Sequence, residues 1–151
     1  MLRRLGRDLR SLLSDPAEDD AGVQRLFPRA YLDPTEEEAE TQWRALAGSD
    51  LLRGRLDAVD ALIRTTSTVH GSRIRLRLDA ADEAAWLGVL NDLRLVLGSR
   101  LSLSDDPDTT IPADHPLAEL VPLYDWLTSL QAALIDVLLA ETPEEGRPTE
   151  L

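Results

Sequence analysis

Residues 79–101 have the sequence DAADEAAWLGVLNDLRLVLGSRL, which predicts one long helix at the centre of the fold. Asp79 is a typical N-cap residue, and Asp82 and Glu83 place negative charge in the first turn, where the helix dipole favours it. Gly98 is a typical stop signal near the other end. Apolar residues recur at three- and four-residue steps and form one wide face: Trp86, Leu87, Val89, Leu90, Leu93, Leu95, Val96 and Leu97. A helix with so wide an apolar face needs neighbours on several sides.

Three polar residues interrupt this helix, namely Asn91, Asp92 and Arg94. If they are buried they need partners, because an unpaired buried charge is costly. Two interpretations stay open: the three residues fasten the helix to its surroundings, or they form a polar recognition site. Asp125 in the last helix is a candidate counter-ion for Arg94 if the two helices lie antiparallel. The interaction candidates in this region are Asn91, Asp92, Arg94, Tyr124, Asp125 and Trp126.

Other segments with helical spacing predict a mainly α protein, a single-domain bundle of about five helices with one short strand. The predicted helices besides the central one cover residues 1–14, 33–47, 50–66 and 116–141. Asp33 and Ser49 are expected to cap the second and third helices, and Leu46 is expected to face inward. The last helix has heptad spacing from Leu120 to Val137, which is typical of a helix packed lengthwise on another.

The strand is predicted for Arg73–Leu78, where apolar residues and arginines alternate in the sequence RIRLRL. A single strand is not stable alone, so we expect it to pair with residues 23–32, with residues that precede Met1, or with a second copy of the chain. This unpaired edge motivates a homodimer hypothesis. Arg73, Arg75 and Arg77 either guard the edge or bind an acidic partner, and they join the interaction candidates.

The segments between these elements predict connectors. Residues 15–22 are acidic and predict a loop, and residues 23–32 predict an extended segment docked by its apolar side chains. Residues 102–115 predict a solvated acidic connector. The bundle is expected to occupy residues 1–141 as a single domain, followed by a disordered acidic tail at 142–151.

Composition excludes several functions. The 151 residues carry a net charge of −12, which argues against nucleic-acid binding by bulk charge and against a membrane-surface role. All 16 basic residues are arginine and cysteine is absent, so lysine Schiff bases, disulfides and thiolates have no place in this sequence. We find no catalytic, cofactor-binding or metal-ligand pattern and therefore predict a non-enzyme. Without a signal-peptide pattern or about 18 uninterrupted apolar residues, we expect a cytoplasmic protein with no membrane span.

Four stretches carry a family pattern: RLFPRAY (25–31), SDLLRGRLDAVDAL (49–62), RIRLRLDAADEAAWLGVLNDLRLVLGSRL (73–101) and LYDWLTSLQAALIDVLL (123–139). They resemble the actinobacterial family known as domain of unknown function 2017, with WLGVLNDLRLVLGSRL and LYDWL as the most specific motifs. The resemblance extends from Leu2 to Leu139. It implies no catalytic residues.

The resemblance implies a regulatory role through protein contacts, as a transcriptional co-regulator in stress or cysteine metabolism. Genes of the family tend to lie near those of a Clp protease adaptor and of cysteine synthesis, and a member is described as an aerobic and oxidative stress regulator acting with a sigma factor. A sigma factor, RNA polymerase or a Clp adaptor is therefore the implied partner. A cysteine-based redox sensor does not fit this chain, which has no cysteine.

Two alternatives to a regulatory interaction module stay open. The first is a DNA-binding regulator, although the net charge disfavours it. It would use either the arginines of the predicted strand, Arg73, Arg75 and Arg77, or those of the N-terminal helix, Arg3, Arg4, Arg7 and Arg10. The second is an uncharacterised small-molecule-binding protein, which an apolar pocket lined by Asn91, Arg94 and Tyr124 would support.

Overall fold

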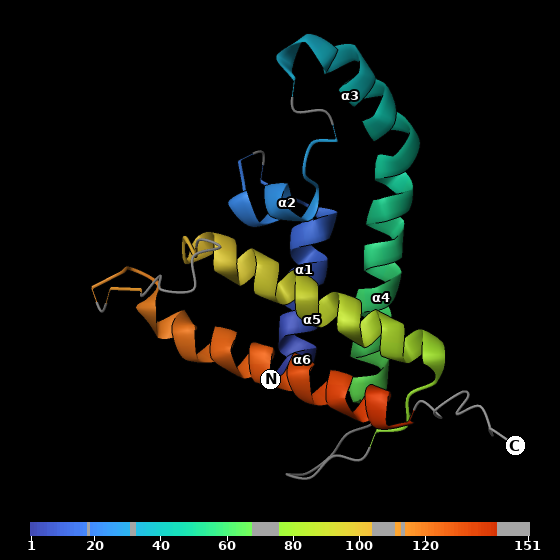
Figure 1. Ribbon diagram of the computed structural model, residues 1–151, viewed down its shortest axis with the longest axis vertical. Coiled ribbons are helices and arrows are strands. Elements are labelled where there is room, and N and C mark those ends of the chain that lie inside the picture. The colour runs from blue at the N-terminus through green and yellow to red at the C-terminus, as the bar shows by residue number, and fades with distance from the viewer. Residues whose placement is uncertain (18, 31–32, 68–75, 104–110, 113, 142–151) are drawn as a thin grey trace, which may run out of the picture.

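The computed structural model describes residues 1–17, 19–30, 33–67, 76–103, 111–112 and 114–141, and it is mainly helical, as predicted (Figure 1). The α helices are α1 (Leu2–Ser14), α2 (Ala21–Leu26), α3 (Glu37–Trp43), α4 (Ser49–Ser67), α5 (Ala80–Arg100) and α6 (Val121–Glu141). Short helical turns cover Pro34–Glu36, Arg44–Gly48 and Ala118–Leu120. The predicted tail at 142–151 lies outside the described residues.

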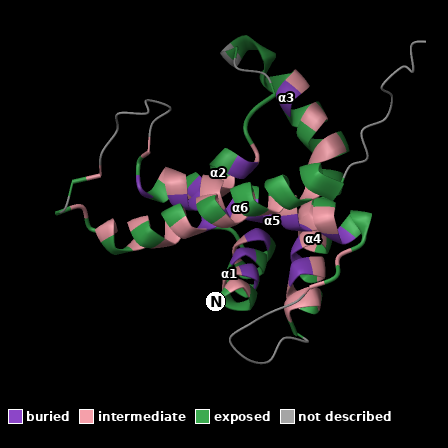
Figure 2. Cartoon of the chain, turned by 60° about the horizontal axis from the view of Figure 1, so that its bottom comes forward, coloured by how far each residue is buried: buried purple, intermediate pink, exposed green. Residues whose placement is uncertain are grey.

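Helix α5 is the central element, since α1, α2, α4 and α6 all pack against it (Figure 1). Its buried residues concentrate where these helices meet, while much of α6 stays half-buried or exposed (Figure 2). The buried apolar residues of α5 are Trp86, Val89, Leu90, Leu93, Val96 and Leu97, all members of the predicted apolar face. The prediction that this helix organises the core is therefore confirmed.

The start of α5 is as predicted and its end is not. The Asp79 carboxylate accepts a hydrogen bond from the Asp82 backbone N–H at 2.8 Å, as an N-cap does. Gly98 does not stop the helix, which continues to Arg100. Ser102 takes the left-handed conformation with φ 54° instead, and the Leu103 N–H donates back to the Gly98 carbonyl at 2.9 Å. This is a Schellman ending with serine where glycine is usual.

Helix α2 replaces part of the predicted loop and part of the predicted extended segment. The Asp20 side chain accepts a hydrogen bond from the Val23 N–H at 3.0 Å and so caps the start of this helix. The acidic residues before it predict a loop instead of a helix. Phe27 follows the helix and docks half-buried, with the Arg55 guanidinium 5.2 Å from its ring centroid. The rest of the predicted extended segment includes Tyr31 and Leu32, which lie outside the described residues.

Helices α3 and α4 form one continuous helical path that projects beyond the other helices (Figure 1). Asp33 caps its start as predicted, accepting a hydrogen bond from the Thr35 N–H at 2.9 Å. Ser49 is not a cap, because the wider turn Arg44–Gly48 carries the backbone through without a break. Leu46 is 79% exposed and does not face inward. Glu40 is buried instead, where it accepts hydrogen bonds from the Ala30 N–H and from Arg44.

The predicted strand is not supported. Within the described part of the chain no segment forms a strand, and residues 76–78 lead irregularly into α5. Arg73 and Arg75 lie outside the described residues. Leu76 and Leu78 pack half-buried against the core. Since no strand occurs among the described residues to pair with residues 76–78, the apolar positions of this pattern serve to dock the two leucines.

Helix α6 begins at Val121 rather than at residue 116, after the single turn Ala118–Leu120. It packs mainly against α5, with Leu127 fully buried and the other leucines of the heptad half-buried. The heptad prediction is wrong at its last position, because Val137 is 54% exposed. This end of α6 lies beside the start of α5 and residues 76–78, and Val137 lines the groove between them.

Alanine substitutions at two glycines, Gly22 and Gly88, are expected to change the free energy of unfolding in opposite directions. A Cβ on Gly22 would lie 2.8 Å from Val96 Cγ1 and 3.3 Å from Val96 Cα, whereas a Cβ on Gly88 would meet nothing within 4 Å. We expect Gly22→Ala to lower the free energy of unfolding by about 1–3 kcal/mol, since α2 must move away from α5. Gly88→Ala is expected to raise it by up to about 1 kcal/mol through helix propensity. Urea unfolding followed by circular dichroism measures both, and shifts in the same direction would contradict this packing of α2.

Candidate functional site

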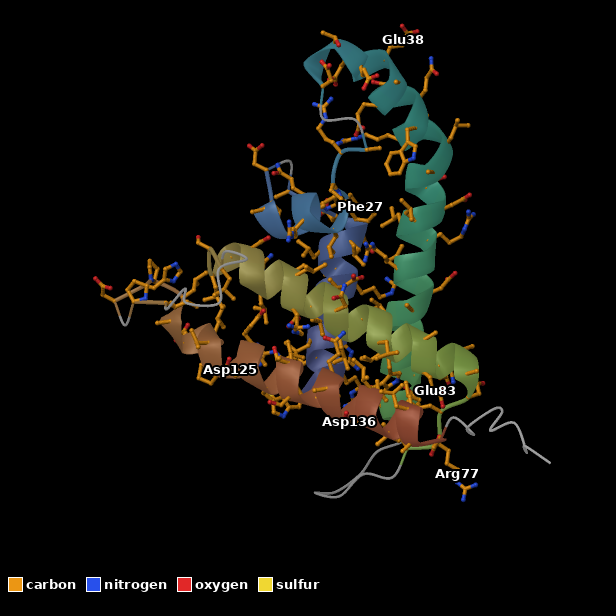
Figure 3. All side chains as sticks on the ribbon, viewed as in Figure 1. Phe27, Glu38, Arg77, Glu83, Asp125 and Asp136 are labelled. Atoms are coloured by element: carbon orange, nitrogen blue, oxygen red, sulfur yellow. The ribbon has the colours of Figure 1, made fainter. Side chains whose placement is uncertain are left out.

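Arg94 joins α5 to α6 through neutral partners. Its Nε donates to the Thr128 Oγ1 at 2.9 Å and its Nη1 to the Gln131 Oε1 at 2.5 Å. Its guanidinium lies 5.6 Å from the centroid of the Tyr124 ring. The helices are antiparallel, as the Arg94–Asp125 prediction assumed, but Asp125 is exposed and Thr128 and Gln131 take its expected place (Figure 3). Asp125 lies about one helical turn before the residues of α6 that contact Arg94.

A pocket of about 570 Å³ opens beside Arg94, between α2, α5 and the start of α6. Three of the predicted interaction candidates line it together, namely Asn91, Arg94 and Tyr124. The sequence had not indicated Arg25 from α2 or Ser99 from α5, which also line it. The sequence does not predict Arg25 at this pocket, because its segment has the pattern of an extended stretch rather than of a helix packed on α5. We call this cavity the Arg94 pocket.

Asp92 points to a different neighbour and fastens helices together. It is buried and forms an ion pair with Arg55 of α4, which also donates to the Leu26 carbonyl at 2.9 Å. Burial raises the pKa of the Asp92 carboxyl, and the hydrogen bond and charge of Arg55 oppose that rise. This network ties α5, α4 and the end of α2 to one another. Of the two interpretations of Asp92, fastening is the one that its contacts support.

Arg77 lies at the rim of a second cavity, a groove of about 600 Å³ between α5, α6 and the segment before α5. Its side chain is exposed and projects beside the end of α6 (Figure 3). The walls are largely apolar and include Leu78, Trp86, Leu90, Leu130, Leu134 and Leu138. Glu83 and Glu141 are the acidic residues that line it. We call this cavity the α5–α6 groove.

The outer face of α6 continues the apolar surface of the groove. Val137 is 54% exposed and Leu139 is 69% exposed, and Ile135 is exposed beside them. Over the described residues, Ala118–Glu141 is the one helical span long and apolar enough to cross a membrane by length and composition, with a mean hydropathy of 1.3. Core helices of soluble proteins pass that test too, but they are mostly buried, and only 6% of this window is buried. Trp126, the remaining candidate on α6, is half-buried against the core.

The arginines of α1 are exposed, as the DNA-binding alternative requires. Arg10 forms an ion pair with Asp60 of α4 at 2.7 Å, and Arg4 lies 3.9 Å from Asp8. Both contacts reduce the positive charge that α1 offers to a phosphate backbone. DNA binding through this helix stays a prediction. No group of three or more potential metal ligands occurs among the described side chains.

Comparison with known proteins places the chain in a family. The family model described as domain of unknown function (DUF2017) matches residues 1–138. The oxidative stress regulator AosR of Mycobacterium bovis and that of Mycobacterium tuberculosis strain H37Rv are each 33% identical to this chain over 131 residues, which cover 80% of this chain and 59% of each relative. A relative from Mycobacterium leprae is 32% identical over 133 residues, covering 81% of this chain and 60% of its own length.

The chain thus spans about 60% of the length of the curated relatives it matches. No solved structure matches it. Because the family model matches nearly the whole described chain, the protein belongs to the DUF2017 family.

Proposed function

We propose that this protein is a non-enzymatic cytoplasmic regulator that binds another protein through the exposed apolar face of α6 and the adjoining α5–α6 groove. The observation that carries the proposal is the exposure of α6, whose apolar span is only 6% buried. A large apolar surface on a soluble protein is typical of an interaction site. The relatives named oxidative stress regulators support the regulatory part of the proposal.

The chemistry of the surface favours, as a partner, an amphipathic helix with basic residues beside its apolar face. Helix α6 contains the acidic residues Asp125, Asp136 and Glu141 and no basic residue. Glu83 adds a further negative charge on the opposite wall of the groove. A helix that buries leucines in the groove and places arginine or lysine at its rim therefore complements both the shape and the charge.

A DNA-binding protein fits this description, because its basic helices bind the phosphate backbone of DNA. We propose a sigma factor of RNA polymerase as the partner, with an acidic surface of this protein covering a basic helix of the sigma factor. The regulated process would be the stress response or cysteine metabolism. RNA polymerase itself and a Clp adaptor are the other partners that the family resemblance implies.

A membrane is a poorer occupant of this surface. Asp125 and Asp136 lie within the apolar span, and a carboxylate in hydrocarbon is costly. The helix also lacks the basic flanking residues that bind anionic lipid headgroups. A second copy of the chain would bring acidic residues against acidic residues, which disfavours the homodimer at this face.

Val137→Asp is expected to weaken binding of a basic amphipathic helix by about tenfold or more, because it places a charge in the centre of an apolar contact. The probe is a labelled peptide of about 18 residues with leucines at helical spacing and lysines elsewhere. Fluorescence anisotropy measures its binding, and the same titration with a purified sigma factor of the host tests the named partner. The matched control is Leu46→Asp, which introduces the same charge at an apolar residue that is exposed on the Arg44–Gly48 turn.

Several outcomes would overturn this proposal. The first is equal binding of a second peptide that carries glutamates in place of the lysines. The second is equal weakening by Val137→Asp and Leu46→Asp. Binding of the chain to phosphatidylcholine vesicles in place of the peptide would identify a membrane surface, and a dimer mass in light scattering that Val137→Asp converts to a monomer would identify a second copy.

A further inference from the structure

The positive charge of Arg94 meets no carboxylate among the described residues. Three other arginines of the described chain each pair with an acid: Arg55 with Asp92, Arg64 with Asp82, and Arg100 with Asp20. Arg94 is half-buried between two helices, and its hydrogen bonds go to a threonine hydroxyl and a glutamine amide. Neutral acceptors orient a guanidinium without neutralising it, so a full charge remains at this place in the protein.

The surroundings of Arg94 concentrate that charge. The chain has 28 acidic residues and a net charge of −12, yet the described residues that line the Arg94 pocket include no aspartate or glutamate. Arg25 of α2 lines the same pocket. A hollow lined by one sign of charge raises the local concentration of ions of the opposite sign. In an otherwise acidic protein, this pocket is a place where an anion is favoured.

The pocket also offers directional contacts. A guanidinium has five N–H donors, and Thr128 and Gln131 occupy Nε and Nη1. The remaining donors of Arg94, with the Asn91 amide and the Ser99 hydroxyl, suit the oxygens of a carboxylate or phosphate. Leu95, Leu103 and the Tyr124 ring provide an apolar wall beside them. Its volume of about 570 Å³ lies within the range of about 300–1,000 Å³ typical of small-molecule pockets.

We propose that the Arg94 pocket binds an oxyanion, a carboxylate or phosphate carried on an apolar or aromatic body. The oxyanion meets Arg94 and Arg25, and the body lies against Leu95, Leu103 and Tyr124. The ligand is a free anionic small molecule or an acidic side chain of a protein partner, which share this chemistry. The pocket uses the beginning of α6, and the proposed protein-docking face uses its other end, so either proposal can fail without the other.

Phenyl phosphate is the first probe, because it joins an oxyanion to an aromatic ring. In a nitrogen–proton correlation spectrum at low salt, we expect saturable shifts of the Gly98 and Ser99 amides, which line the pocket. Benzyl alcohol, which has the ring without the charge, is expected to leave them in place. A blocked peptide with one glutamate between two leucines is the second probe, and the tighter of the two binders identifies the source of the oxyanion.

Arg94→Met is expected to weaken the tighter probe by about tenfold or more, since charge-assisted hydrogen bonds are the strong ones. Arg94→Lys should retain part of the affinity because it keeps the charge. Arg25→Met changes an exposed residue of α2 and should weaken binding by about threefold, even if Arg94→Met disturbs the contact between α5 and α6. The matched control is Arg7→Met, which removes the same charge from the exposed face of α1 and should leave affinity within about twofold.

Equal weakening by Arg7→Met and Arg25→Met would overturn the proposal, because it would show a response to net charge alone. Shifts that do not saturate, or that appear on α1 rather than around Gly98, would overturn it as well. Binding of the peptide that Val137→Asp abolishes and Arg25→Met leaves unchanged would assign the peptide to the docking face and not to the Arg94 pocket.

Discussion

Replacing Asp92 by alanine is expected to lower the free energy of unfolding by about 2–4 kcal/mol, because it leaves the Arg55 guanidinium without its counter-ion. Asp92 is buried on α5, and the Arg55 side chain is 27% exposed, so some water can still reach the orphaned charge. Arg55 also holds the Leu26 carbonyl and lies over Phe27, and both contacts are expected to loosen. Urea unfolding at neutral pH measures the loss.

The double variant Arg55→Met with Asp92→Leu distinguishes the contribution of the ion pair from that of the buried volume of the two side chains. It removes both charges and keeps the apolar volume, so it should recover much of the stability that Asp92→Ala loses. Arg55 Nε is a buried donor without a partner in the described structure, and its removal favours the same outcome. A double variant that is less stable than either single one would contradict the account of Asp92 as a buried charge held by Arg55.

The same carboxylate predicts the sign of a pH dependence. Burial raises the pKa of Asp92 in the folded state against the opposing effect of Arg55. Its contribution to stability is therefore full below the unfolded pKa of about 3.9 and is lost as the pH rises through the raised folded value. Asp92→Asn cannot titrate, so the wild type should lose stability relative to that variant as the pH rises from about 4. The opposite slope would mean that Arg55 dominates over burial.

Trp86→Ala is the second large effect, with an expected loss of about 3–5 kcal/mol from removing a buried aromatic side chain. Trp86 lies between α4 and α5 and is nearly fully buried. Its Nε1–H donates to the Thr65 Oγ1 at 2.9 Å, so the ring is held in place as well as packed. Circular dichroism in urea measures the loss without depending on tryptophan fluorescence.

Two further variants serve as comparisons for the stability loss expected of Trp86→Ala. Trp86→Phe keeps most of the apolar volume and loses the hydrogen bond, so it should cost about 1–2 kcal/mol. Trp126→Ala removes the same side chain from α6, where it is only half-buried, and should cost clearly less than Trp86→Ala. Equal losses at the two tryptophans would show that α6 is as much a part of the core as α5.

Several elements were predictable from the sequence because their cause lies within a few residues. Asp79 and Asp33 each cap a helix by accepting a hydrogen bond from a backbone N–H two or three residues ahead. The apolar face of α5 follows from spacing alone. Helix α2 was missed because it is short and depends on its packing against α5, with Gly22 in close contact with Val96.

The candidate site was predictable only as a set of residue types. The structure brings Asn91, Arg94 and Tyr124 to one pocket, and their role as a site stays a prediction. The partner of Arg94 was wrong by one turn of α6, since the sequence does not specify how two helices slide along each other. Arg25 could not be assigned to the pocket without knowing that α2 exists.

The sequence by itself determined that the protein is mainly helical, that α5 is its central helix, and that these residues hold no cysteine chemistry. Those properties depend on composition and on short-range periodicity. Only the tertiary structure decided that Asp92 is fastened to Arg55 while Arg94 keeps its charge beside a pocket. The reason is geometric, because residues two positions apart on a helix face different neighbours, and those neighbours come from segments distant in the chain.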